Sequence, residues 1–126
     1  MLRYAKGARS ERELIGLFSE KGFSVIRAAG SGVSSLCPDI LVFKGGKQYG
    51  FECKAWECGS LSIEKEKMKA LKEWERNTGI TTFIAWRIGR VGWRFLYLDE
   101  LEEREKNYTI SMRKAMMINR GIAELC

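Results

Sequence analysis

Residues 38–54 read PDILVFKGGKQYGFECK, and they predict the centre of the fold. The apolar run at 39–43 predicts a central strand, because no polar residue interrupts it after Asp39. The Gly45-Gly46 pair predicts a tight turn, and residues 48–54 predict the returning strand. The stretch therefore predicts a β-hairpin with Asp39 and Glu52 at the same end of the sheet.

The end of this hairpin carries a combination of side chains suited to chemistry. Because side chains alternate across a strand, Glu52 and Lys54 share one face while Cys53 points the other way into packing. Asp39 and Glu52 would repel each other unless a cation lay between them, and Mg²⁺ prefers such oxygen ligands. Lys54 could position a water or stabilise charge on a phosphate. The pattern favours magnesium-dependent cleavage of a phosphodiester; the alternative is a surface ion pair between Glu52 and Lys54.

A third acidic residue, Glu11, lies on the inward side of a predicted helix. It precedes Leu14, Ile15 and Phe18 by three, four and seven residues, and these positions share one helix face. This placement makes Glu11 a candidate third acid of the metal site. The alternative is a carboxylate that is favoured there by the helix dipole.

The composition limits the classes of function. The chain has 126 residues, a net charge of +6, a pI near 9.3 and no His. The length suits a single domain, residues 1–126, and the charge favours a polyanionic partner such as nucleic acid, or else is that of an ordinary basic protein. The absence of His excludes Ser-His-Asp and Cys-His hydrolases. The four Cys residues are expected to be free thiols: Cys37, Cys53, Cys58 and Cys126.

The sequence shows no apolar run long enough for a membrane span and no signal core at the N-terminus, so we expect a cytoplasmic protein without a membrane partner. Outward from the hairpin, a capping box at Ser10 and Glu13 predicts a helix that ends at Gly22. The remaining pattern predicts strands at 23–27, 81–87 and 93–98, and helices at 60–78, 99–106 and 111–125. This order indicates an α/β fold, a mixed sheet with helices on both faces and at least one parallel pair.

Two further features could contact phosphates. The small-residue loop at 28–37 contains Gly30-Ser31-Gly32, whose backbone N–H groups could approach a phosphate, although a flexible connector is the simpler interpretation. Four basic residues lie near the proposed site in sequence and could bind a nucleic-acid backbone or remain solvated: Lys6, Arg9, Arg12 and Arg27.

The chain resembles the archaeal Holliday junction resolvases. The similarity lies in residues 6–14, in Ala29-Gly30-Ser31, in the P-D…E-x-K hairpin and in residues 91–95, in that order. It extends from about residue 4 to residue 98 and fades beyond residue 99. The Ser34-Ser35-Leu36-Cys37-Pro38 segment differs from other members in length and composition.

The resemblance implies a type II restriction-endonuclease-like fold with a central mixed five-stranded sheet flanked by helices. It also implies a homodimer that cuts four-way DNA junctions with Mg²⁺, for which Mn²⁺ could substitute. The family's catalytic acids fall on Glu11, Asp39 and Glu52, its catalytic lysine on Lys54, and its loop serine on Ser31.

The same resemblance gives the expected ligands and contacts. The three acids are the expected metal ligands, together with the backbone carbonyl of Cys53. The family's basic residues linked to DNA binding fall on Arg12 and Arg27. With Lys6, Arg9 and Ser31, named from the sequence itself, they make up the expected DNA contacts. Two alternatives stay open: a restriction or repair endonuclease that acts on linear duplex, and a non-catalytic nucleic-acid-binding protein.

Overall fold

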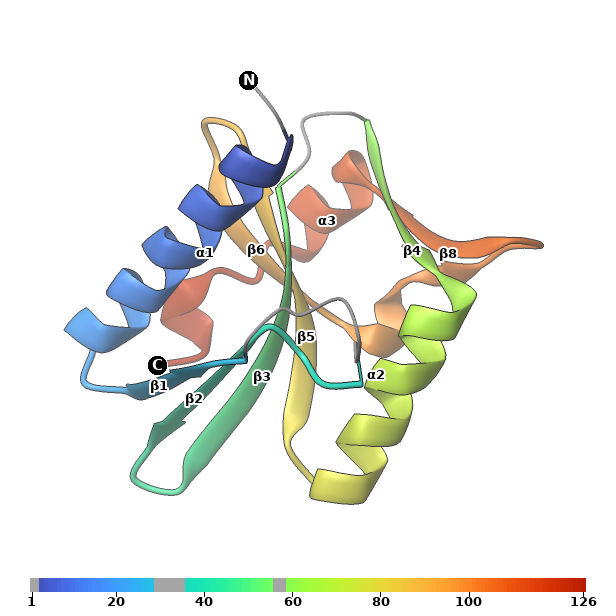
Figure 1. The fold of residues 1–126 in the computed structure, drawn as a ribbon. Coiled ribbons are helices and arrows are strands. Elements are labelled where there is room, and N and C mark those ends of the chain that lie inside the picture. The colour runs from blue at the N-terminus through green and yellow to red at the C-terminus, as the bar shows by residue number, and fades with distance from the viewer. Residues whose placement is uncertain (1–2, 29–35, 56–58) are drawn as a thin grey trace.

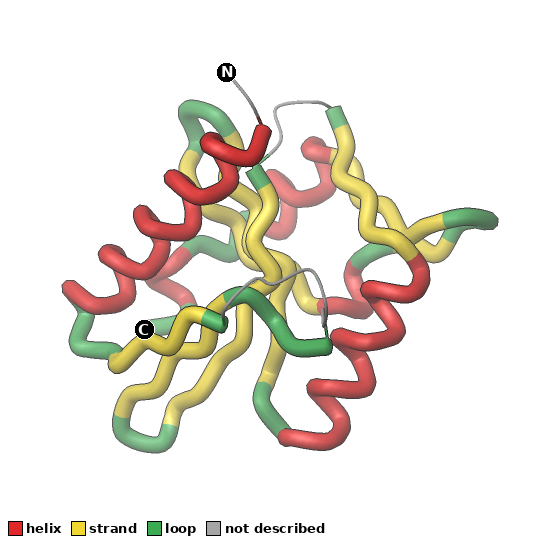
Figure 2. Tube along the Cα trace, viewed as in Figure 1, coloured by secondary structure: helices red, strands yellow, loops and turns green. Residues whose placement is uncertain are grey.

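The computed structural model describes residues 3–28, 36–55 and 59–126, and the chain winds through two sheets and three α-helices there (Figures 1 and 2). The elements in chain order are α1 (Arg3–Glu20), β1 (Ser24–Arg27), β2 (Ile40–Lys44), β3 (Lys47–Lys54), β4 (Ser60–Glu64), α2 (Lys65–Thr78), β5 (Thr81–Ile88), β6 (Gly92–Tyr97), β7 (Glu102–Glu103), β8 (Asn107–Ser111) and α3 (Met112–Ile118). Short 3₁₀ turns cover Leu98–Glu100 and Ile122–Glu124.

The central sheet has five strands in the order β1-β2-β3-β5-β6. Its β2–β3 hairpin is antiparallel and pairs Ile40 with Phe51 and Lys44 with Lys47, as the sequence predicted. The connection through β4 and α2 returns the chain parallel to β3, so that β5 pairs with it in the same direction. The predicted mixed five-stranded sheet is therefore confirmed.

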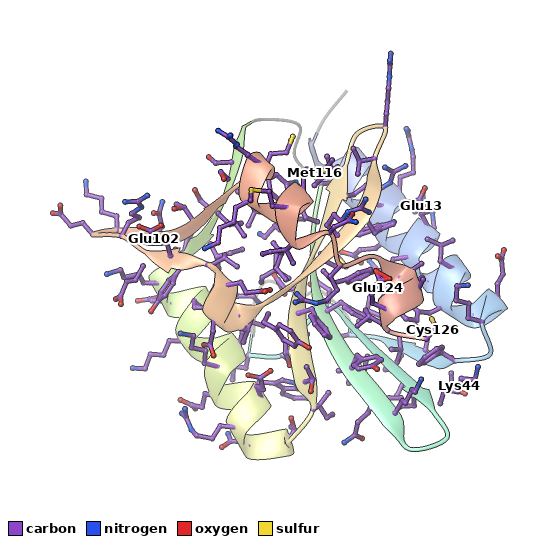
Figure 3. The ribbon with its side chains drawn as sticks, turned by 180° about the vertical axis from the view of Figure 1, so that it is seen from behind. Glu13, Lys44, Glu102, Met116, Glu124 and Cys126 are labelled. Atoms are coloured by element: carbon purple, nitrogen blue, oxygen red, sulfur yellow. The ribbon has the colours of Figure 1, made fainter. Side chains whose placement is uncertain are left out.

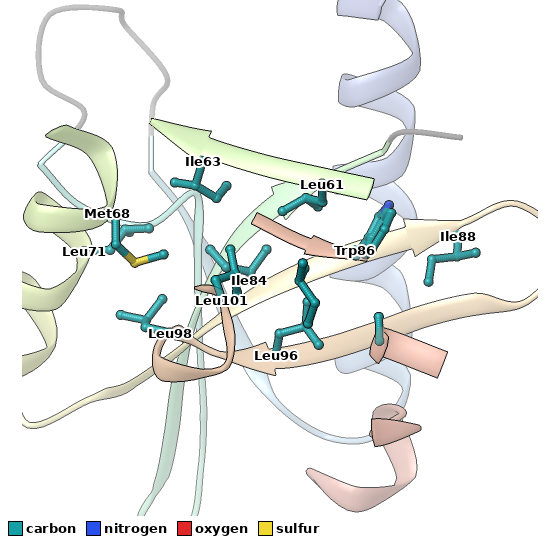
Figure 4. Close-up of a cluster of buried hydrophobic side chains, with 12 residues drawn as sticks. Leu61, Ile63, Met68, Leu71, Ile84, Trp86, Ile88, Leu96, Leu98 and Leu101 are labelled. Atoms are coloured by element: carbon teal, nitrogen blue, oxygen red, sulfur yellow. The ribbon is translucent and has the colours of Figure 1, made fainter. Parts of the chain in front are cut away.

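Each face of this sheet is covered by a different helix. Side chains of β3 and β5 alternate, so Phe51 and Phe83 pack against Leu14 and Phe18 of α1 on one face. On the other face, Ile84 and Trp86 belong to the cluster that contains Met68 and Leu71 of α2 (Figure 4). The helices thus flank both faces, as predicted.

The prediction of one helix over 60–78 is wrong at its start. Residues 60–64 form β4, in which Leu61 and Ile63 are buried while Ser60, Ser62 and Glu64 are exposed. This alternation is the period of a strand, and α2 begins only at Lys65. Strand β4 pairs with β8, and β8 with β7, in a second, three-stranded sheet that the sequence analysis missed.

The other helix boundaries also require correction. Helix α1 begins at Arg3, so Ser10 lies inside the helix and is not its N-cap; Ala5, Ala8 and neighbouring charged residues favour helix and extend it. The predicted end is confirmed, because Gly22 has a φ of +88° and Phe23 N–H donates to the Phe18 carbonyl.

The region after residue 98 is less helical than predicted. The expected helix at 99–106 is instead the 3₁₀ turn followed by β7, and residues 107–111 form β8. The expected helix at 111–125 is α3, which ends at Ile118 because Asn119 adopts a left-handed conformation with a φ of 53°. The C-terminal segment then returns to the α1 side, where Leu125 is buried and Glu124 and Cys126 are seen from behind (Figure 3).

Three of the cysteines lie in the described residues, and Cys37, Cys53 and Cys126 are all free, as predicted; Cys58 lies outside them. Among the described helices, none combines the length and the apolar character needed to cross a membrane.

Candidate active site

The site lies where β3 extends past the end of β2. Ile40, the first residue of β2, pairs with Phe51, so Glu52, Cys53 and Lys54 continue beside β5 without a β2 partner. Continuing the same register places Asp39 opposite Glu52. The carboxylate oxygen Oδ2 of Asp39 accepts a hydrogen bond of 2.9 Å from the backbone N–H of Cys53. The structure therefore brings Asp39 and Glu52 together.

Close packing at Pro38 fixes the start of β2. A Cβ atom added to Gly50 would lie 2.9 Å from Cγ of Pro38, which is closer than real Cβ contacts. Glycine at this position lets the proline ring lie directly on β3. The position of Asp39, the next residue, follows from that contact.

Glu52 is the most deeply buried carboxylate of the site, with 6% of the residue exposed. Burial, and then the charge of Asp39, raise its pKa from 4.5 to about 7. Its atom Oε1 lies 3.5 Å from the Nζ atom of Lys67 on α2, yet it accepts no hydrogen bond from the described residues. A buried carboxylate oxygen therefore keeps lone pairs that are not used within the described protein.

Burial also raises the pKa of Asp39, against the opposing effect of the Cys53 N–H, and the negative charge of Glu11 raises it further. Glu52 and Lys54 lie opposite Ile84 and Trp86, on the α2 face of the sheet, so they share one face as predicted. Cys53 packs on the other face, where burial raises the pKa of its thiol well above the usual value.

Glu11 is half-buried on α1, and its Oε1 atom accepts a hydrogen bond of 2.9 Å from Nε of Arg27 on β1. This ion pair holds Glu11 beside Arg27. The negative charge of Glu11 is close enough to Asp39 to raise the pKa of Asp39. Within the described ranges, however, no three acidic or thiol side chains gather closely enough to form a ready metal cluster. The structure thus assembles two of the three predicted acids directly.

The structure describes the side chains of only some of the remaining predicted residues. Arg9 and Arg12 are exposed on α1. Lys6 belongs to the same helix, but its side chain is outside the described part, and the prediction for Ser31 also falls outside the described residues.

Two charged groups with specific contacts were not predicted from the sequence: Lys67 beside Glu52, and Glu13 between α1 and the sheet. Lys67 was hidden in a helix rich in charged residues, where nothing in the pattern marks one lysine. Glu13 anchors α1 to the sheet, because its Oε1 accepts hydrogen bonds from Trp93 Nε1 at 2.6 Å and from Arg87 Nε at 2.7 Å. Its position three residues after Ser10 suggested a cap and concealed this role.

The donor set fits a divalent cation. Two adjacent carboxylates need positive charge between them, and the unbonded, buried Oε1 of Glu52 is a hard oxygen ligand of the kind that Mg²⁺ and Mn²⁺ take. Lys54 follows on the same face of the same strand. The arrangement has the parts needed to hydrolyse a phosphodiester with the help of a metal ion.

A mixed sheet with this hairpin at its centre has the architecture of the restriction-endonuclease-like nucleases. The chain belongs to the archaeal Holliday junction resolvase family, whose model matches residues 2–125. It is similar to the crossover junction endodeoxyribonuclease Hjc of Archaeoglobus fulgidus, with 36% identity over 107 residues that cover 84% of this chain and 79% of the relative.

Two further comparisons agree. The enzyme of the same name from Methanocaldococcus jannaschii is 33% identical over 121 residues, covering 93% of this chain and 85% of the relative. The 1.6 Å structure of A. fulgidus Hjc, a Holliday junction resolvase from an archaeal hyperthermophile, superposes with a TM-score of 0.79 and 30% identity. That match covers 89% of this chain and 88% of the solved one.

Proposed function

We propose that this protein is a structure-selective endonuclease that resolves four-way (Holliday) DNA junctions in recombination and repair. The observation that carries the proposal is the contact of Asp39 with the β3 segment that bears Glu52, in a chain of the archaeal junction resolvase family. The reaction is hydrolysis of a phosphodiester bond in each of two strands. The catalytic residues are Glu11, Asp39, Glu52 and Lys54, with Ser31 as a further candidate.

The proposed cofactor is Mg²⁺, with Mn²⁺ as a substitute. Asp39 and Glu52 would hold it, with Glu11 as a third acid. The backbone N–H of Cys53 points to Asp39, and because the N–H and C=O of a strand residue point to the same side, the Cys53 carbonyl is directed there too. When bound, the ion would neutralise charge on the scissile phosphate and lower the pKa of a water.

Lys54 supplies the ammonium of the site. It lies on the same face of β3 as Glu52, two residues further along the strand, and is partly exposed. Its charge can stabilise the negative charge that develops on the phosphate or position the attacking water. The neighbouring acids are buried, so the local dielectric constant is low, and the interaction of Lys54 with the phosphate is stronger than it would be in water.

The proposed DNA contacts are phosphate contacts by basic side chains. Arg9 and Arg12 are exposed on α1, and Arg27 lies beside Glu11 at the site. Lys6 and Ser31 complete the set on the basis of the sequence. A net charge of +6 supports binding to the backbone of DNA without sequence readout.

A homodimer is part of the proposal. One metal site cuts one strand, whereas resolution of a junction requires cuts in two opposed strands. A two-fold dimer presents two identical sites that match the near two-fold symmetry of a junction. Met117 of α3 is 77% exposed and could contribute to a subunit interface, whereas Ala115 of the same helix packs on its own domain.

A cleavage assay on a four-way junction and on a linear duplex of the same sequence, with and without Mg²⁺, tests the proposal. We expect junction cleavage only with the metal and little cleavage of the duplex. Equal cleavage of both substrates would favour the restriction- or repair-type alternative. Binding without cleavage under all metal conditions would favour the non-catalytic one.

A further inference from the structure

Lys67 places a second ammonium against the acidic pair, from an element outside the hairpin motif. Its Nζ atom lies 3.5 Å from Oε1 of Glu52, and its side chain is only 18% exposed. Its charge also opposes the rise in the pKa of Asp39. Lys67 thus acts on both carboxylates that we propose as metal ligands.

The packing of α2 directs Lys67 towards the sheet. Met68 and Leu71, which follow it by one and four residues, are fully buried in the core on this face. Farther along the helix, Glu75 Oε2 accepts a hydrogen bond of 2.8 Å from the backbone N–H of Thr82 on β5. Positions 67, 71 and 75 lie on one side of a helix, so both packing and a hydrogen bond hold this side against the sheet.

The contact offsets part of the charge of Glu52 but leaves its coordination incomplete. A buried carboxylate needs a partner charge, and Lys67 supplies one. At 3.5 Å, however, the ammonium is too distant to make a good hydrogen bond, and Oε1 accepts none from the described residues. The ammonium therefore stands beside the oxygen that a cation would coordinate, and two positive charges cannot share that position without repulsion.

We propose that Lys67 is a positioning residue that holds Glu52 in the cation-free protein and competes with the divalent cation for it. This inference rests on the proposed function, since it takes Glu52 as a metal ligand. It makes metal affinity a property of α2 as well as of the hairpin. Removal of the ammonium is expected to tighten metal binding, although it removes a stabilising contact.

The test is Mn²⁺ binding by isothermal titration calorimetry to the DNA-free protein, at about pH 9 so that protonation of Glu52 contributes little. We expect K67Q to bind Mn²⁺ about fivefold more tightly than the wild type. The matched control is K69Q, which removes the same charge from the same helix at an exposed position. K69Q, and K67R with its charge retained, should stay within about twofold of the wild type.

Thermal unfolding provides a second measurement. Without metal, K67Q should unfold at a lower temperature than K69Q, and saturating Mn²⁺ should raise its Tm by more than it raises that of the wild type. K67M, which keeps an apolar stem, serves if K67Q does not fold. Unchanged or weaker Mn²⁺ binding by K67Q, or by K67M where K67Q does not fold, overturns the role of Lys67.

The two proposals fail in different ways. Mn²⁺ binding that is lost in D39N but unchanged in K67Q would overturn the inference and leave the metal site intact. If the wild type and all variants bind no Mn²⁺, the metal site itself is wrong, and the role of Lys67 falls with it.

Discussion

The carboxylate of Asp39 is tied to the backbone of Cys53 by a hydrogen bond of 2.9 Å, at the point where the ladder between β2 and β3 stops. The side chain takes over the role of the missing strand partner. Because Cys53 follows Glu52 directly, this bond fixes the separation of the two acids. A residue that we propose as a metal ligand is thus also a structural connection between strands.

Asp39→Asn separates these two roles. Asn keeps an oxygen that can accept the Cys53 N–H but loses the charge, so we expect near-native stability with cleavage reduced by at least about 100-fold. Asp39→Ala loses both the charge and the hydrogen bond, so its free energy of unfolding should be about 1 kcal/mol lower than that of the wild type. Urea denaturation and single-turnover cleavage measure the two effects.

Binding provides the control for this experiment. Both variants should bind the junction at least as tightly as the wild type, because the proposed phosphate contacts come from Lys and Arg. A D39N protein that cleaves at the wild-type rate would contradict the assignment of Asp39 to the metal site.

Glu52 makes stability depend on pH. In the folded protein the pKa of Glu52 is about 7, whereas the ordinary pKa of a glutamate is 4.5. The stability from this group is fully present below the ordinary pKa and is lost as the pH rises through the folded value. Relative to E52Q, the wild type should lose about 3 kcal/mol between about pH 4 and pH 8. Denaturant titrations at several pH values measure this difference.

A divalent cation should reverse that loss. In the proposed site Mg²⁺ binds the ionised carboxylate of the native state, so it should raise the Tm of the wild type at high pH and leave E52Q unchanged. Cleavage by the wild type should also fall at acidic pH, because a protonated Glu52 is a poor ligand and the metal must displace its proton. The same pH profile in E52Q would show that Glu52 is not the group responsible.

The sequence predicted the parts of the molecule where local pattern and final packing agree. The apolar run at 39–43 and the Gly45-Gly46 turn specify the hairpin without help from distant residues, and the crossover to β5 follows from chain order. The prediction for residues 60–64 was wrong because this short strand is followed directly by α2, and the helical pattern of α2 was extended over it. The pairing of β4 with β8 joins segments far apart in the chain, which no local pattern contains.

The same distinction between local pattern and long-range packing holds for the candidate site. The spacing of Asp39, Glu52 and Lys54 is local to a hairpin, so their shared face follows from strand alternation. The contacts of Lys67 and Glu13 depend on how helices dock on the sheet. Charged residues on helices usually face solvent, so composition gave no reason to select these two.

Gly50 offers a test of the packing that fixes Asp39. Gly50→Ala would force its Cβ against the Pro38 ring, which lies 2.9 Å from that position, and the ring cannot rotate away. We expect a loss of about 1–3 kcal/mol in unfolding free energy, with reduced cleavage as Asp39 shifts. Gly16→Ala on α1 is the matched control, because its Cβ would meet nothing within 4 Å. This substitution should raise the free energy of unfolding by about 0.5–1 kcal/mol, since Ala favours the helix over Gly. Equal effects of the two substitutions would count against this packing argument.

Glu13 should contribute to stability out of proportion to its exposure. Glu13→Ala leaves the Nε1 atom of Trp93 without its hydrogen bond partner in a residue that is 6% exposed. We expect a loss of about 1–3 kcal/mol, compared with almost none for Glu20→Ala, which changes an exposed carboxylate on the same helix. Glu13→Gln retains an acceptor for Trp93 and should fall between them. Thermal unfolding of the three variants checks the order.

The proposed homodimer, with one site in each protomer, predicts a specific product from mixed protomers. A supercoiled plasmid that extrudes a cruciform becomes linear when both opposed strands are cut in one binding event, and becomes a nicked circle when one strand is cut. Wild-type dimers should produce linear DNA, whereas dimers of one wild-type and one D39N protomer, co-expressed with two affinity tags, should produce nicked circles. Because D39N keeps the hydrogen bond to Cys53, the inactive protomer should hold its half of the junction as the active one does. Mixed dimers that still linearise the plasmid in single turnovers would show that one site can make both cuts, and the paired mechanism would then have to be abandoned.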